Sequence, residues 1–232
     1  AKVTKTLRLM KDHPAVYQTH DIDGGQGDLT FAHHPMVHLS GGGHVGFSPK
    51  IAAVTPAGAL EPKHKLAYPA RSSDLSRFPA ENGGTVDLHN YPAEATQGDP
   101  LGHEDFVTLI EAPKAQLGWT AVTRFGENDI VIFLKDPKVA PVTMMWHSNG
   151  GRDYAPWDGR HTGVLGIEDG CCAGAATVAQ SVSDNPISRE GCATSLSLGP
   201  SKHTQVRHAI VRIPLPKGWR GVAQISAHAQ SL

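Results

Sequence analysis

Short segments in which apolar and polar residues alternate run through most of the chain, and glycine or proline interrupts them. A period of two is the side-chain period of a β-strand. The 232 residues include 25 glycines and 17 prolines, and helix-period stretches are hard to find. This pattern predicts an all-β sandwich or barrel, which we expect to form a single domain over residues 1–232. The expected strands are residues 3–9, 15–22, 29–39 (bent at Pro35), 44–54 (split at Pro49), 106–112, 117–125, 130–135, 142–146, 162–167, 204–213 and 221–227, with a short helix at 173–180 and a turn-rich excursion over 55–97.

Charge and cysteine content exclude several classes of protein. The formal net charge is −1, and lysines and arginines are scattered, which gives no footprint for nucleic acid or an anionic membrane. No apolar run is long enough to span a bilayer. Three cysteines without a CxxC spacing indicate buried free thiols. We expect a cytoplasmic monomer or homodimer.

The beginning of the sequence suggests a trimmed or partial chain. It opens on Ala1 without an initiator methionine, and residues 3–9 already alternate like a strand in the middle of a sheet. N-terminal strands are therefore expected to be missing.

Residues 143–172 concentrate groups that can meet a polar ligand. Two apolar segments, 142–146 and 162–167, enclose a loop rich in glycine, asparagine and aspartate, and the second segment is expected to end at Glu168. Polar and aromatic side chains between two strands are typical of a binding loop, although a decorated surface loop has the same composition. The side chains in question are His147, Asn149, Arg152, Asp153, Tyr154, Trp157, Arg160 and His161.

Histidines gather in a second region, at His33, His34, His38 and His44. With Glu168 they are candidate ligands of a zinc or iron ion, but their spacing matches no metal motif. A glutamate and a histidine brought together by the fold would instead serve as a general base and a general acid near neutral pH. A purely structural cluster is the third interpretation.

Residues 102–106, read Gly-His-Glu-Asp-Phe, lead directly into an apolar strand. They indicate either a solvated strand entry or the ligand-facing end of a loop. Serine-nucleophile, phosphate-loop and dinucleotide motifs are absent from the sequence.

Three segments, in this order, resemble motifs of the aldose 1-epimerase (galactose mutarotase-like) superfamily: His34-Pro35-Met36, the polar lead into Phe106, and Gly166-Ile167-Glu168. The resemblance implies a large antiparallel β-sandwich with a sugar in a cleft. It implies Glu168 as the general base and His34 as the general acid of anomer interconversion, without a metal or other cofactor. Substrate-binding roles would fall to His33, Asp105, His147, Arg152 and Trp157.

The chain also departs from the family pattern. Met36-Val37 replaces the usual aromatic residue after the acid histidine, and the family's Asn-Arg segment has no match before His34. Either that segment lies outside this chain, or this is a divergent member. Two rival functions follow: a non-catalytic carbohydrate-binding module on the same fold, and a metal-dependent β-barrel enzyme built on His33, His34, His38 or His44. A glycosidase is disfavoured because it would require two carboxylates.

Overall fold

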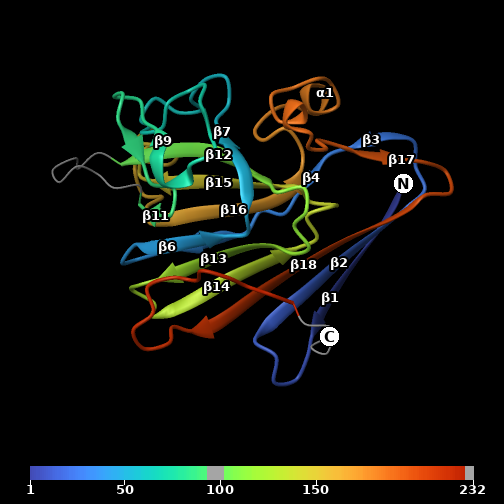
Figure 1. Cartoon of the computed structure of the whole chain (residues 1–232), viewed down its shortest axis with the longest axis horizontal. Helices are drawn as coiled ribbons and strands as arrows, with labels where there is room; N and C mark the ends of the chain where they lie inside the picture. The colour runs from blue at the N-terminus through green and yellow to red at the C-terminus, as the bar shows by residue number, and fades with distance from the viewer. Residues whose placement is uncertain (93–101, 228–232) are drawn as a thin grey trace.

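The structure is a computed structural model that describes residues 1–92 and 102–227. Two antiparallel sheets face each other as the layers of a sandwich (Figure 1). Loops, short strands and the single described α-helix lie above the upper sheet, and the N-terminal hairpin extends from one end of the lower sheet. The all-β expectation is confirmed, and the two-layer arrangement is a sandwich. The end of the 55–97 excursion lies outside the described residues.

The lower sheet has seven described strands in the order β1-β2-β18-β14-β13-β6-β11. Their bounds are β1 Lys2–Leu9, β2 Ala15–Asp23, β18 His203–Pro214, β14 Asp129–Lys135, β13 Gly118–Arg124, β6 Gly43–Phe47 and β11 Asn90–Tyr91.

The upper sheet runs β4-β16-β15-β12-β7-β8, and β5 also pairs with β16. Its bounds are β4 Phe31–Ala32, β16 Val164–Cys171, β15 Val142–Asn149, β12 His103–Glu111, β7 Lys50–Val54, β8 Arg71–Ser72 and β5 Met36–His38. Small elements complete the fold: the pairs β9 Phe78–Pro79 with β10 Thr85–Val86 and β3 Gly27–Leu29 with β17 Leu196–Leu198, the helix α1 Val178–Ser181, and two 3₁₀ turns, Leu75–Arg77 and Ser188–Glu190.

The main core fills the space between the sheets. Val107, Leu109 and Met145 from the upper sheet meet Val122 and Phe133 from the lower one, and all five are at most 1% exposed. Burial of this apolar surface is the main force that holds the two layers together. Among the described residues, no helix is long and apolar enough to cross a membrane.

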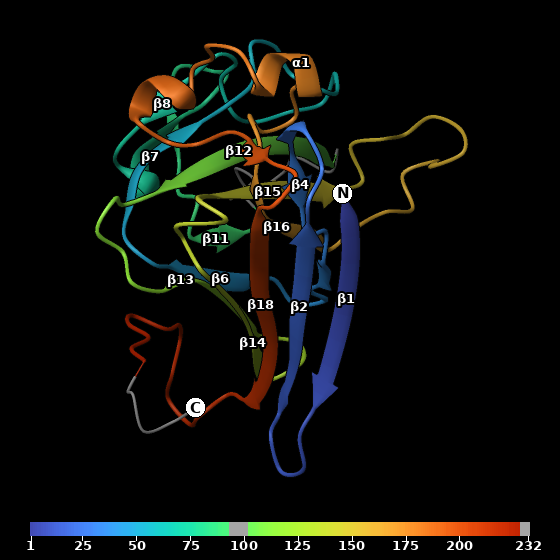
Figure 2. The same ribbon diagram turned by 90° about the vertical axis from the view of Figure 1, so that its right-hand side faces the viewer.

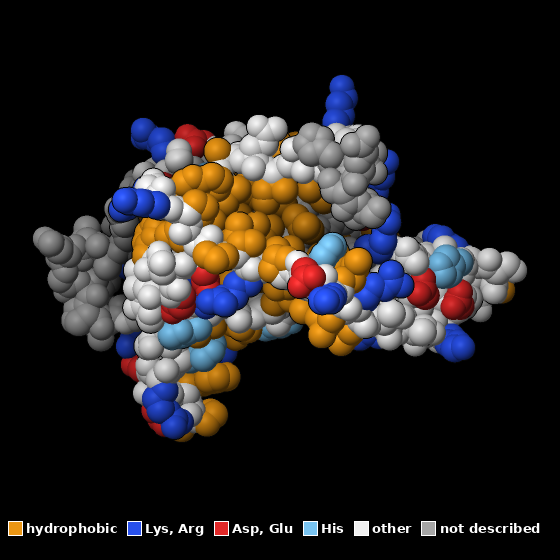
Figure 3. Space-filling model, turned by 90° about the horizontal axis from the view of Figure 1, so that it is seen from below, with side chains coloured by type: hydrophobic (Ala, Val, Ile, Leu, Met, Phe, Trp, Pro, Cys, Tyr) orange, Lys and Arg blue, Asp and Glu red, His pale blue; other side chains and the backbone are white. Residues whose placement is uncertain are grey.

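A second cluster covers the outer face of the lower sheet. Trp119, Ala121 and Ile130 point outward there, and Val222 from the C-terminal segment packs onto them. Seen from below, hydrophobic side chains gather in the middle of this face (Figure 3).

Four expectations about secondary structure are corrected or refined. Residues 221–227 form no strand, because Val222 packs onto Trp119 from an irregular segment. The strand expected at 162–167 starts later and continues to Cys171, so Glu168 lies inside it. Of the helix expected at 173–180, only α1 forms. The segment 44–54 divides near Pro49, as expected, but its halves β6 and β7 join different sheets.

Candidate active site

Strand register decides which side chains of the upper sheet can share a site. Glu168 on β16 pairs with Met144 on β15, and Met144 pairs with Thr108 on β12. Directly paired residues point to the same side of a sheet. Glu168, Met144 and Thr108 therefore face outward, away from the lower sheet, and so do Trp146 and Glu104, which lie an even number of residues away along their strands.

His34 and Glu168 meet on this outer face. His34 lies in the break between β4 and β5, on the edge of the sheet beside β16. Its Nε2 is 3.3 Å from Oε1 of Glu168, and the side chains are 55% and 9% exposed, respectively. The carboxylate is thus sheltered, while the imidazole is open to solvent.

Burial and the nearby histidine act in opposite directions on the carboxyl group. Burial raises the pKa of Glu168 above its ordinary value, and His34 only partly opposes this. A side chain at Gly166 would begin 3.1 Å from Oε1 of Glu168 and 3.2 Å from Cβ of Trp146. Glycine at this position therefore leaves the space between the carboxylate and the indole open.

Trp146 lies next to His34 and Glu168, and hydrogen bonding to a buried carboxylate holds its indole in place. The indole Nε1 donates to Oε2 of Glu104 at 2.9 Å, and the Ser148 hydroxyl donates to Oε1 at 2.9 Å. Nδ1 of His161 lies 2.6 Å from the same hydroxyl. The indole and the His34 ring make a T-shaped contact, with centroids 5.9 Å apart.

The loop between β15 and β16 brings a cation over the indole. It extends from the body as the gold segment of Figure 2. The Arg152 guanidinium lies 4.6 Å from the ring centroid of Trp146 and 5.0 Å from that of Trp157. Its Nε donates to Glu61 at 2.7 Å, and the Tyr154 hydroxyl also donates to Glu61. Arg152 and Trp157 thus lie on the same side of the sheet as Glu168.

Asp105 and His147 point the other way, into the space between the sheets. Asp105 is 2% exposed and accepts hydrogen bonds from the backbone of Leu66 and from the Tyr68 hydroxyl, and Nδ1 of His103 lies 2.7 Å away. Burial of His147 lowers its pKa to about 4. The structure does not bring either residue together with Glu168, because neighbouring positions in a strand face opposite sides.

His33 also faces inward. Its ring stacks on His208 at 4.1 Å, and burial lowers its pKa to about 4. Nε2 of His208 lies 3.1 Å from Oδ2 of Asp169, and Lys135 Nζ lies 3.0 Å from Oδ1 of the same carboxylate. These contacts connect the two sheets through a buried polar network, which is separate from the outer face.

The four histidines proposed as metal ligands have separate partners. His33 stacks on His208, His34 faces Glu168, His38 lies 3.5 Å from Glu127, and His44 stacks on His89. Within residues 1–92 and 102–227, no group of three or more His, Cys, Asp or Glu side chains is arranged to hold a metal ion. The described residues therefore provide no set of ligands for the metal-dependent enzyme considered from the sequence.

Sequence reasoning missed three residues of the outer face: Glu104, Trp146 and Glu61. The sequence pattern marks Trp146 only as the end of an apolar strand, and the family resemblance points to Asp105 and not to its neighbour Glu104. The alternation within β12 contains a usable signal, because Glu104 shares the parity of Phe106 and Thr108, whereas Asp105 shares that of Val107 and Leu109. Glu61 lies in the long excursion, where no pattern marks it.

No protein-family model matches the sequence, and no curated protein matches it significantly. Solved structures do resemble its fold. A candidate aldose 1-epimerase from Escherichia coli K12 gives a TM-score of 0.55 at 16% identity, over 92% of this chain and 60% of that one. A galactose mutarotase-related enzyme from Lactobacillus acidophilus gives 0.52 at 14% identity, over 93% and 62%. A candidate aldose 1-epimerase from Klebsiella pneumoniae gives 0.50 at 16% identity, over 90% and 46%.

The chain thus shares the fold of these three structures, which is the fold that the resemblance implied. It spans about half to three-fifths of the length of these structures.

Proposed function

We propose that this protein interconverts the anomers of an aldose by acid–base catalysis, with Glu168 as the base and His34 as the acid. The observation that carries the proposal is their pairing, 3.3 Å apart, on an outer face of the sandwich beside an indole. One group is a sheltered carboxylate and the other an exposed imidazole, which are the two side-chain types that general acid–base catalysis most often uses.

The chemistry requires two proton transfers on oxygens that share one carbon. Glu168 takes the proton of the anomeric hydroxyl, while His34 donates a proton to the ring oxygen and the bond from C1 to that oxygen breaks. The open aldehyde rotates about its C1–C2 bond. Closure from the other face reverses both transfers and gives the other anomer, with no net change in protons.

The raised pKa of Glu168 suits the role of a base, because a more basic carboxylate accepts a proton more readily from a hydroxyl. It also predicts that activity is lost, as the pH falls, at a pH above the ordinary pKa of a glutamate. To admit a sugar, the His34–Glu168 contact must open. His34 is the partner free to swing away, since more than half of its side chain is exposed.

Trp146, Trp157 and Arg152 are the proposed binding groups. An indole offers an apolar face to the C–H side of a sugar ring, and a guanidinium donates hydrogen bonds to hydroxyls. His33, Asp105 and His147 face the space between the sheets, so this proposal gives them no contact with the sugar.

A sugar-binding module without catalytic activity is the second candidate. The lack of a ring-sized gap between the two groups favours it, because a module needs no sugar between His34 and Glu168, whereas the enzyme must first open their contact. Anomer interconversion measured by saturation-transfer NMR on a panel of freshly dissolved aldoses separates the two functions. Faster exchange than in buffer supports the enzyme, whereas line broadening of a sugar without faster exchange supports the module.

A further inference from the structure

A pocket lies on the same side of the upper sheet as Glu168 but apart from it. Its volume is about 400 Å³, within the usual range for small-molecule sites. Neither Glu168 nor His34 lines it. Met144 separates Thr108 of this pocket from Glu168 in the cross-strand row, and Cys172 packs on Met144 with 3.5 Å between the two sulfur atoms. We call it the Thr108 pocket.

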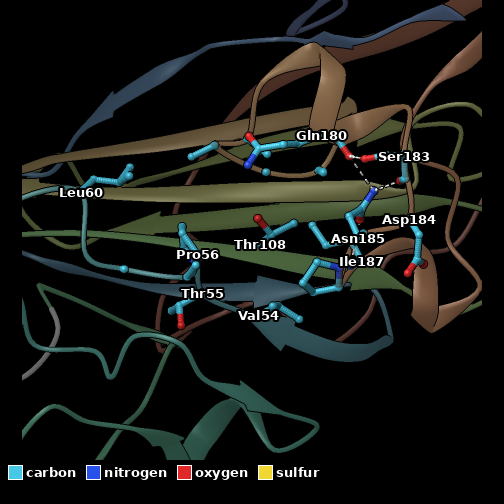
Figure 4. A pocket seen from close by; sticks show the side chains of 17 residues that line it. Val54, Thr55, Pro56, Leu60, Thr108, Gln180, Ser183, Asp184, Asn185 and Ile187 are labelled. Atoms are coloured by element: carbon cyan, nitrogen blue, oxygen red, sulfur yellow. Dashed lines mark hydrogen bonds between the residues drawn. The ribbon is translucent and has the colours of Figure 1, made fainter.

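The walls of the Thr108 pocket are mainly aliphatic (Figure 4). Val54 and Thr108 form the floor, and the loops after β7 and after β16 form the sides. The aliphatic lining residues are Val54, Pro56, Leu60, Pro186 and Ile187, together with several alanines. The loop after β16 can pass close over the floor only because residue 174 is glycine, since a Cβ there would lie 2.6 Å from the Thr108 hydroxyl.

Two polar groups face this aliphatic space without a protein partner among the described residues. The Thr108 hydroxyl belongs to a residue only 2% exposed and makes no hydrogen bond there. The Gln180 amide oxygen accepts from the backbone N–H and the hydroxyl of Thr177, while its NH₂ group, on a solvent-exposed residue of the lining, has no partner among the described residues. Figure 4 shows the Thr108 oxygen and the Gln180 nitrogen directed into the pocket.

The lining also excludes several kinds of ligand. Its one charged side chain, Asp184, pairs with Arg189 at 2.6 Å, so no unpaired charge is available for an ionic ligand. No aromatic side chain lines the pocket, so a sugar ring would find no stacking surface. Two free polar groups cannot satisfy a polyhydroxylated molecule, and each buried hydroxyl without a partner weakens binding.

We propose that the Thr108 pocket binds a neutral aliphatic molecule of roughly six to ten carbon atoms that carries one carbonyl or hydroxyl oxygen. The chain packs along Val54, Leu60 and Ile187. The oxygen accepts from the Gln180 amide and exchanges a hydrogen bond with the Thr108 hydroxyl. This site is independent of the proposed epimerase activity.

Titration of the full chain with four six-carbon probes tests the proposal: hexanamide, 1-hexanol, hexanoate and hexylammonium. Methyl ¹H–¹³C spectra locate binding at Val54 and Ile187 and give its affinity. Saturable shifts with hexanamide and 1-hexanol, and much weaker ones with the two ions and with glucose, are expected. Equal binding of an ion or of glucose, or no saturable shift with either neutral probe, overturns the proposal.

Two variants each remove one polar group. Thr108→Val is isosteric, and Gln180→Glu keeps the oxygen that Thr177 requires while it removes the amide donor. Each should weaken hexanamide binding by about two- to tenfold. The matched controls Thr6→Val and Gln116→Glu, at exposed positions, should leave it unchanged, and thermal unfolding verifies that all four variants fold. Binding that both Thr108→Val and Gln180→Glu leave unchanged contradicts the proposal.

Discussion

Glu168 and Asp169 are neighbours in β16, but their pKa values are displaced in opposite directions. Glu168 faces outward, and burial with only one imidazole nearby raises its pKa. Asp169 faces inward; burial acts to raise its pKa too, but Lys135 and hydrogen bonds from His208 and Thr143 outweigh that effect and hold it far below the usual range. One strand thus supplies a basic carboxylate to the candidate site and an ionised one to the buried network.

Replacement of Glu168 by glutamine should stabilise the protein at neutral and alkaline pH. A raised pKa means that the folded state prefers the protonated carboxyl, so folding loses stability as the pH rises through that pKa. Glutamine removes this loss, and the difference from wild type should disappear in acid. Urea unfolding from acid to alkaline pH measures the free energy of unfolding of wild type and Glu168→Gln, with the exposed Glu81→Gln as control. A Glu168→Gln protein less stable than wild type at pH 8 would contradict this account.

Lys135→Met should destabilise the fold severely. Lys135 Nζ lies 3.0 Å from Asp169 and 3.1 Å from Glu111, and its side chain is 1% exposed. Without this cation, the buried charges of Asp169 and Glu111 lose one of the positive charges that balance them. The loss of one partner of a buried ion pair typically costs about 3–5 kcal/mol of stability. Urea denaturation, with the neighbouring Lys138→Met as control, provides the free energy of unfolding. A loss below about 1 kcal/mol would show that the network relaxes without its lysine.

Asp105→Asn should reduce stability without changing the activity of the folded protein. The Asp105 carboxylate accepts hydrogen bonds from Leu66 N and the Tyr68 hydroxyl between the sheets, where loss of a partner costs about 1–3 kcal/mol. Thermal unfolding and anomer exchange are measured on the same sample, beside the exposed Asp28→Asn. If exchange falls a hundredfold while stability is unchanged, Asp105 contacts the sugar after all.

Trp146→Phe should weaken sugar binding more than it slows the chemical step. Phenylalanine keeps an aromatic face but removes the N–H that donates to Glu104 and the larger surface beneath Arg152. We expect KM to rise about tenfold with kcat within about threefold. The exposed Trp219→Phe is the control, and anomer-exchange rates at several sugar concentrations give both constants. A fall in kcat alone would instead place Trp146 in the chemistry.

Much of the lower sheet was predictable from local alternation. The strands expected at 117–125, 130–135 and 204–213 differ from β13, β14 and β18 by at most one residue at each end. The segment 221–227 has a similar composition but makes no ladder, because Val222 packs over the face of the sheet, on Trp119 and next to Gly46, and not beside an edge strand. The local alternation of apolar and polar residues indicates which side chains are buried. Tertiary packing decides whether those side chains are buried within a strand.

The meeting of His34 with Glu168 was predictable only through the family resemblance, since 134 positions separate them. The sequence alone does not show whether Asp105 or Glu104 faces the site. A shift of one residue along a strand turns a side chain to the opposite face, and a single sequence does not show which parity faces the site. In the structure, Glu104 pairs with Ser148 and accepts a hydrogen bond from Trp146, so Glu104 is the residue that faces the site.

The rate of anomer exchange in wild type, Glu168→Gln and His34→Asn tests the central proposal most directly. His203→Asn, which alters a histidine paired with Asp23 on the exposed hairpin side, is the matched control. The account predicts exchange above the buffer rate for wild type and the control, and a loss of about 10²–10⁴-fold in each of the two site variants. Exchange that persists in both variants, or a wild type no faster than buffer with any aldose, would contradict it.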